Sequence, residues 1–118
     1  MSAEWRVVGP EAAGRSWDRD LLSLRDASLT QGSAWGGHKE RRGQEVIRLA
    51  ASEGGEVRAM AQAFVQRRFG AALAWMPGGP VGDLALCGEG LREAVRAAVG
   101  ASRLVVRIRP YRPYLAED

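Results

Sequence analysis

Side chains suited to binding an anionic ligand lie within residues 31–80. Lys39 is the only lysine of the chain, and its ammonium group is a compact, flexible charge that can approach a phosphate. It follows Trp35 by four residues, and Trp75 precedes the turn sequence MPGGP, where a large aromatic ring suits the core or the wall of a cleft. Lys39 is therefore physically suited to a phosphate contact. The alternative is that it only complements the dipole at the end of a helix.

Residues typical of metal sites and nucleophilic catalysis are scarce. His38 is the only histidine and Cys87 the only cysteine, so the sequence shows neither a metal-ligand cluster nor a nucleophile–base pair. We expect His38 on a helix surface and Cys87 as a buried thiol in a reducing compartment. Asp83 is expected to be a turn or cap residue. The sequence thus assigns no catalytic residue, no metal and no cofactor.

Basic residues are concentrated in the middle of the chain. Residues 39–68 hold seven bases against four acids, and the whole chain has a net charge of +3. These bases could form a face for tRNA phosphates, and solvated surface arginines explain them equally well. The arginines concerned are Arg41, Arg42, Arg48, Arg58, Arg67 and Arg68.

The composition is otherwise that of a soluble globular domain, with 46% hydrophobic and 26% charged residues. No apolar run is long enough to form a transmembrane segment, and the N-terminus has no readable secretory signal. We therefore expect a cytoplasmic protein. Its 118 residues fit one domain with one core.

Two helices are predicted after a short first strand. The strand covers residues 5–8 and ends before Gly9-Pro10. Ser16 is a plausible N-cap for the first helix, in which apolar residues follow at helical spacing, namely Trp17, Leu21 and Leu24. Ser33 is expected to cap a second helix that ends at Arg42, with Gly43 in the C′ position. The pair Gly36-Gly37 inside it predicts either a short helix or a close approach to its backbone.

A hairpin and a final strand–helix–strand pattern complete the predicted fold. Gly54-Gly55 forms the predicted turn after residues 45–51, and the returning strand places small residues on one face, namely Val57, Ala59, Ala61, Ala63 and Val65. A further strand spans residues 71–76. An amphipathic helix follows, with an inward face of Leu91, Ala94, Val95, Ala98 and Val99. A last strand is predicted at 104–109, before an irregular tail.

The resulting order, β-α-α-β-β-β-α-β, is similar to the opening of the GNAT acyltransferase fold. Residues 17–83 also resemble the first GNAT-like domain of FemABX-type aminoacyltransferases. The matching features are Gln31, Trp35, Lys39, Gly43-Gln44 and the turn WMPGGP. Trp75 stands where that family has tyrosine, and Gly78 where it has arginine. The closing strand resembles the family's Arg-x-Glu-Pro ending, with Arg107 in place and Arg109 at the position of the acid.

This resemblance implies an α/β (α+β) fold with a mixed, mainly antiparallel sheet flanked by helices. Residues 1–118 would form a single GNAT-like domain, the first half of a FemABX protein, with the second half absent. The implied reaction moves an amino acid from aminoacyl-tRNA to the stem peptide of a UDP-linked or lipid-linked muramyl pentapeptide, a peptidoglycan precursor. The implied substrate-binding residues are Lys39, Trp35, Trp75 and Arg107. The location would be cytoplasmic, or peripheral at the inner face of the membrane.

Two other functions are compatible with the same sequence. One is a non-catalytic GNAT-like scaffold that pairs with itself, or with a second GNAT-like half, through an open sheet edge. The other is a CoA-dependent N-acetyltransferase using acetyl-CoA. The segment Arg67–Ala72 matches an Arg-x-x-Gly-x-Ala phosphate loop, but a strand rather than a helix is predicted to follow it. The glycine-rich loop before the helix at residue 91 has no basic residue, so acetyl-CoA is the weaker interpretation.

Overall fold

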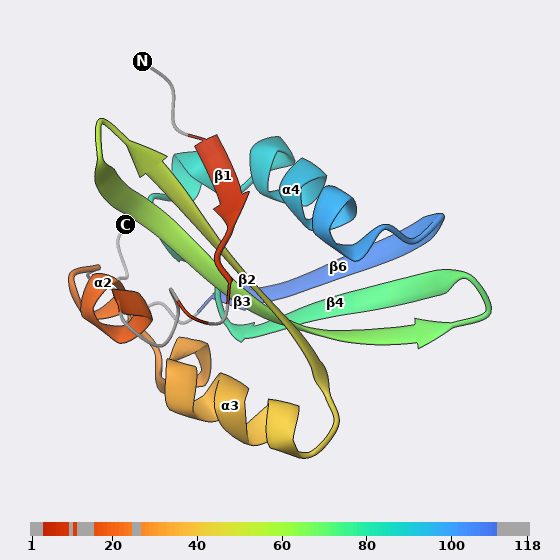
Figure 1. Cartoon of the computed structure of the whole chain (residues 1–118). Coiled ribbons are helices and arrows are strands. Elements are labelled where there is room, and N and C mark those ends of the chain that lie inside the picture. Colours follow the sequence, from red (N-terminus) through yellow and green to blue (C-terminus); the bar gives the residue numbers. More distant parts are fainter. Residues whose placement is uncertain (1–3, 10, 12–15, 25–26, 111–118) are drawn as a thin grey trace.

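The computed structural model describes residues 4–9, 11, 16–24 and 27–110. One sheet has the strand order β1 (Glu4–Val7), β2 (Glu45–Glu53), β3 (Glu56–Arg68), β4 (Ala71–Gly78) and β6 (Arg103–Pro110), and the short β5 (Val81–Gly82) also pairs with β3. Only the β4–β6 pair among these is parallel. Helix α4 (Glu89–Val99) covers one face, while α2 (Asp18–Leu22) and α3 (Ser33–Arg41) lie on the other (Figure 1). The predicted mixed, mainly antiparallel sheet flanked by helices is confirmed.

The predicted β2–β3 hairpin is present, and its two strands lie in the interior of the sheet. Gly54 and Gly55 both have positive φ angles, 59° and 84°, which a tight turn requires. The small side chains of Ala61 and Ala63 lie in the core cluster formed with α4. Their small size lets the helix pack closely, and α4 buries Leu91, Val95 and Val99 on that face.

A β-bulge near the hairpin corrects one sequence prediction. Ala51 pairs with Ala59, but the next residue, Ser52, pairs with Val57, so Arg58 is an extra residue in β3. The bulge turns Val57 to the opposite face, where it packs in the cluster that contains Trp17. The prediction that Val57 shares the face of Ala59 is therefore wrong, because a strict period of two does not survive an inserted residue.

Both predicted helix caps on the other face also need correction. Helix α2 begins at Asp18, with Trp17 rather than Ser16 in the N-cap position and no side-chain capping bond. Helix α3 has Gly32 as its N-cap. Ser33 lies one residue inside α3 and donates from its backbone N and its Oγ to the Asp18 carboxylate, at 2.8 and 2.6 Å. A neighbouring helix thus supplies the acceptor that caps α3.

The chain ahead of α3 is joined to the sheet by one side chain. The segment η2 (Leu29–Gln31) lies where β3 stops pairing with β4. The Gln31 amide donates from Nε2 to the Gln62 carbonyl at 2.9 Å and accepts from the Gln62 N–H at 2.7 Å, so it pairs with β3 much as a strand would. Gln31 Nε2 also lies 3.1 Å from the Pro77 carbonyl on β4. These buried bonds fix where α3 begins.

The C-terminal elements follow the predicted pattern. Gly100, with φ 72°, ends α4 in the left-handed conformation. Strand β6 alternates half-buried Leu104 and Val106 with exposed residues, but Ile108, predicted on the same face, is 46% exposed. The predicted irregular tail and Pro10 lie outside the described residues. No helix in the described part of the chain is long and apolar enough to cross a membrane.

Candidate functional site: a basic aromatic pocket

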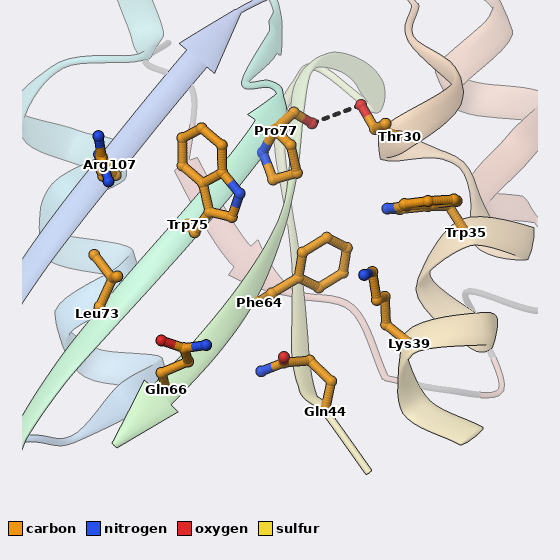
Figure 2. Close-up of a pocket in the computed structure, with 10 residues that line it drawn as sticks. All are labelled: Thr30, Trp35, Lys39, Gln44, Phe64, Gln66, Leu73, Trp75, Pro77 and Arg107. Atoms are coloured by element: carbon orange, nitrogen blue, oxygen red, sulfur yellow. Dashed lines mark hydrogen bonds between the residues drawn. The ribbon is translucent and has the colours of Figure 1, made fainter. Parts of the chain in front are cut away.

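A pocket of about 360 Å³ lies between α3 and the face of β3, β4 and β6 that α4 does not cover (Figure 2). All four substrate-binding residues implied by the FemABX resemblance line it, although Arg107 is 68 residues from Lys39 in the sequence. Their role stays a prediction, but their proximity is a property of the fold. No carboxylate is among the lining residues, which are Thr30, Trp35, Lys39, Gln44, Phe64, Gln66, Leu73, Trp75, Pro77 and Arg107.

Lys39 projects into the pocket from the last turn of α3. It follows Trp35 by one helical turn, and Nζ lies 5.1 Å from the Trp35 ring centroid and 6.0 Å from that of Phe64. The electron-rich ring faces attract the ammonium group and hold it at the pocket wall. Lys39 forms no ion pair within the described part of the chain. Its positive charge is therefore positioned but not neutralised.

Arg107 and Trp75 form the facing wall of the pocket. They are register partners across the parallel β4–β6 pair, and the guanidinium carbon lies 5.6 Å from the Trp75 ring centroid. Figure 2 shows Arg107 and Lys39 on opposite sides, with Trp75 and Phe64 between them. Two cations separated by aromatic surface suit a ligand that carries negative charge and has an apolar body.

Trp35 contributes a hydrogen-bond donor that has no partner in the described part of the chain. Its Nε1 is buried, yet no acceptor bonds to it among the described residues. Figure 2 shows this nitrogen directed toward the space between α3 and the sheet. The corresponding nitrogen of Trp17 donates to the Gln31 carbonyl at 2.7 Å. Because a buried unsatisfied N–H is costly, the Trp35 indole is suited to donating to an oxygen atom of a ligand.

The sequence analysis missed several lining residues. The period of two along β3 places Phe64 and Gln66 on the face opposite its small residues, but only the fold shows that α3 lies over that face. Gln44 donates to the Val65 carbonyl at 2.8 Å and closes the end of the pocket near the α3 C-terminus. Thr30 donates to the Pro77 carbonyl at 2.7 Å and closes the other end.

Helix α3 lies close to the sheet because Gly36 has no side chain. A Cβ at Gly36 would overlap the Gln62 side-chain oxygen and approach Arg48 Nη2 to 2.6 Å. Arg48 itself is only 7% exposed and donates to Gln62 Oε1 at 2.8 Å, with Glu40 at 3.3 Å. The close backbone approach predicted from the glycine pair is thus present at Gly36. The interpretation of Arg48 as a surface residue is wrong.

The proposed basic face for tRNA phosphates does not form as a single surface. Arg48 is buried, Arg58 lies near the β2–β3 turn in an ion pair with Glu53 at 3.4 Å, and Arg67 is bonded to Glu45. Arg41 and Arg42 lie instead at the end of α3. The long β2–β3 hairpin separates Arg58 from the others, whereas Arg42 and Arg67 line one hollow with Lys39 at the opposite end of the hairpin.

The Arg67–Ala72 segment is a hairpin turn between β3 and β4. Phe69 and Gly70 have φ angles of 52° and 80°, and a strand follows, as the sequence predicted. Arg67 donates two hydrogen bonds to the Glu45 carboxylate, at 2.8 and 2.9 Å, and a third to the Val99 carbonyl. The bonds from Arg67 lower the pKa of Glu45 below its ordinary value of 4.5. The arginine of this motif is already occupied by protein groups.

The remaining candidates have ordinary structural roles. His38 is exposed on α3, with its ring centroid 5.8 Å from that of Trp35. Asp83 accepts from the Ala85 N–H at 3.0 Å, as expected of a turn residue. Cys87 is half-buried rather than buried, and its Sγ lies 3.3 Å from the Asp83 carbonyl. Within the described residues, no cluster of histidine, cysteine and acidic side chains is suited to hold a metal ion.

Comparison with known proteins identifies the fold. No protein-family model and no curated protein matches the sequence. Among solved structures, FemX superposes with a TM-score of 0.59 and 22% identity over 82% of this chain and 23% of the FemX chain. Ribosomal-protein-alanine N-acetyltransferase from Brucella melitensis biovar Abortus 2308 gives 0.54 and 14% over 100% of this chain and 85% of its own.

An aminoglycoside acetyltransferase, meta-AAC0020 from an uncultured soil metagenomic sample, gives a TM-score of 0.55 and 9% identity over 98% of this chain and 80% of its own. The chain has a GNAT-like fold. At these identities the likeness concerns the fold alone. The GNAT-like chain spans less than a quarter of FemX, so membership of the FemABX family stays a prediction.

Proposed function

We propose that this GNAT-like chain is the acceptor-binding part of an acyltransferase of the FemABX kind. The reaction would move an amino acid from aminoacyl-tRNA to the stem peptide of a peptidoglycan precursor, without a cofactor. One observation carries the proposal: Lys39, Trp35, Trp75 and Arg107 meet in one pocket that has two cations and no lining carboxylate. The acceptor, a UDP-linked or lipid-linked muramyl pentapeptide, is an anion with a bulky body and fits that character.

In this proposal each pocket residue has a separate task. Lys39 binds a phosphate oxygen through its ammonium group, and Arg107 binds a second anionic group with its planar fork. The ring of Trp75 lies against the body of the ligand, and the buried Trp35 N–H donates to a ligand oxygen. These contacts orient the acceptor. None of them is a proton transfer, and we assign no catalytic residue.

We propose further that residues 1–118 form one GNAT-like domain and that a second GNAT-like half completes the active site. Strand β6 pairs only with β4 among the described residues, so its other edge is open to a partner strand. The aminoacyl-tRNA would bind with the help of that second half. The expected location is cytoplasmic, at or near the inner face of the membrane.

Isothermal titration with the UDP-linked muramyl pentapeptide tests acceptor binding. We expect Lys39→Ala to weaken binding about tenfold or more, because a hydrogen bond to a charged group contributes roughly 1.5–3 kcal/mol. Arg41→Ala is the matched control, since Arg41 is an exposed base on the same helix but outside the pocket. Equal binding of the acceptor by wild type and Lys39→Ala would contradict the assigned role.

A scaffold function is the second candidate, and the open β6 edge favours it. A scaffold would bind its partner without transferring an amino acid. A transfer assay separates the two functions. The full protein is incubated with radiolabelled aminoacyl-tRNA and the acceptor, and only an enzyme yields labelled acceptor.

Binding of acetyl-CoA is disfavoured by two contacts. Arg67, the arginine of the Arg-x-x-Gly-x-Ala match, is bonded to Glu45, and the Trp5 ring lies against Gly90 in the first turn of α4. We expect acetyl-CoA to give no thermal stabilisation.

A further inference from the structure

The turn between β3 and β4 carries an aromatic side chain that the fold does not use. Phe69 is 95% exposed, so almost none of its ring packs against the described protein. Its φ angle of 52° is also a conformation that glycine adopts with less strain than phenylalanine. The turn lies at an end of the sheet that projects beyond α3 and α4 (Figure 1). An exposed ring at a projecting tip is available for an external contact.

Two arginines flank this ring on one face of the sheet. Arg68 on β3 pairs with Ala71 on β4, and Ala71 pairs with Arg103 on β6. The three residues therefore form a row across adjacent strands, and the backbone positions of the two arginines are about 10 Å apart. Both arginines are exposed, and neither forms an ion pair with another described residue.

The surface between these arginines is apolar. Below Ala71, the next row on this face contains Gln66, Leu73 and Val105, of which the last two are apolar, and Val105 is 61% exposed. A shallow hollow is lined here by Gln66, Arg67, Arg68, Ala71, Ala72, Leu73 and Val105. The tip thus combines a projecting aromatic ring, two separated cations and an apolar floor, with no carboxylate among the residues lining the hollow.

We propose that the tip formed by Arg68, Phe69 and Arg103 is a contact site for an anionic lipid surface. An aromatic ring on a projecting turn can enter the headgroup region, while arginines beside it bind lipid phosphates. Single-stranded RNA is the other polyanion with this chemistry. It is less well matched, because a stacking aromatic is expected within the groove that follows the phosphates, whereas Phe69 projects beyond it.

The tip and the basic aromatic pocket share one face of the sheet. Gln66 and Leu73 line both the shallow hollow and the pocket. A lipid surface at the tip would therefore lie beside the opening of the pocket, where a lipid-linked acceptor could be presented. That consequence rests on the proposed function, but the lipid contact does not, since vesicle binding and acceptor binding are measured separately.

Co-sedimentation with vesicles tests the contact. The full protein is expected to bind vesicles of phosphatidylglycerol mixed with phosphatidylcholine and not vesicles of phosphatidylcholine alone. Phe69→Gly should weaken binding at least fivefold, because the inserted apolar ring is lost. Glycine adopts the positive φ angle of this turn readily, so the variant stays folded. Leu22→Ala, at an exposed apolar site on α2, is the control and should bind like wild type.

Arg68→Gln tests the charge in the same assay. We expect a roughly fivefold loss, the effect of one basic residue near an anionic membrane surface. Arg92→Gln removes the same charge from the exposed face of α4 and should change binding less than twofold. The proposal is overturned if wild type binds both kinds of vesicle equally, or if Phe69→Gly binds vesicles as wild type does. It is overturned as well if Arg68→Gln and Arg92→Gln reduce vesicle binding by the same factor. It is also overturned if Phe69→Gly reduces binding to a single-stranded RNA but not to vesicles.

Discussion

Two tryptophans show how the same side chain is used in two ways at the residue scale. Trp17 is buried under the sheet and its indole N–H donates to the Gln31 carbonyl at 2.7 Å. Trp35 lines the pocket and its buried N–H has no acceptor among the described residues. The first N–H supports the fold at the point where η2 meets the sheet. The second is left for a ligand, at a cost that ligand binding can remove.

Replacing each tryptophan by phenylalanine separates these roles. Trp17→Phe leaves the buried Gln31 carbonyl without its donor and should lower the free energy of unfolding by about 1–3 kcal/mol more than Trp35→Phe does. Trp35→Phe removes no hydrogen bond to a described residue, but should weaken acceptor binding several-fold. Urea unfolding and titration with the acceptor measure the two effects. Equal losses of stability in both variants would show that Trp35 has a bonding partner.

At the element scale, the position of α3 depends on a glycine facing the sheet. Gly36 is buried against Gln62 and Arg48, whereas Gly37 has only the flexible end of Arg41 near the place of a Cβ, at 3.4 Å. The two neighbours in one helix therefore have opposite requirements. Because Trp35 and Lys39 are on the same helix, the depth at which Gly36 seats α3 also sets the width of the pocket.

Alanine substitutions at the two glycines test this difference. Gly36→Ala should destabilise the protein by about 1–3 kcal/mol, because a methyl group must displace buried, hydrogen-bonded side chains. Gly37→Ala should be neutral or stabilise by up to about 1 kcal/mol, since alanine is the better helix former. Urea unfolding of both variants provides the measurement. A Gly36→Ala protein as stable as wild type would mean that α3 is not held close to the sheet.

At the scale of the whole molecule, one arginine connects the paired strands β2 and β3 to the end of α4. Arg67 on β3 bonds the Glu45 carboxylate on β2 and the Val99 carbonyl at the end of α4. Both charged side chains are more than 40% exposed, so solvent screens their attraction and the stabilisation is small. The arrangement nevertheless makes stability depend on pH, because Arg67 holds the pKa of Glu45 below 4.5.

A lowered carboxyl pKa stabilises the folded state above the unfolded-state pKa, and that stabilisation is lost as pH falls through the folded-state pKa. Glu45→Gln should therefore be slightly less stable than wild type at pH 7 and equal to it at a pH well below 4.5. Glu56→Gln is the control, since Glu56 is an exposed acid with no ion pair in the described structure. Urea unfolding across this pH range is the measurement. A constant difference between Glu45→Gln and wild type would contradict the linkage.

Much of the fold was determined by local sequence patterns. The period of two in β3, the glycine pair at 54–55 and the apolar face of α4 predicted the hairpin, the small-residue face and the covering helix. These features depend on residues close together in the chain, so local physics determines them. The same patterns failed at Val57 and at the helix caps, where an inserted residue and the Asp18 carboxylate from another helix decide the outcome.

The pocket was only partly accessible to sequence reasoning. The FemABX resemblance named Lys39, Trp35, Trp75 and Arg107, but the sequence did not show that α3 and β6 place them around one space with Phe64 at its centre. It also grouped Arg48 and Arg67 with surface arginines, although one is buried and the other is bonded to Glu45. Strand register and helix packing join residues far apart in the chain, so the sequence by itself determined the elements, and only the tertiary structure decided which side chains meet.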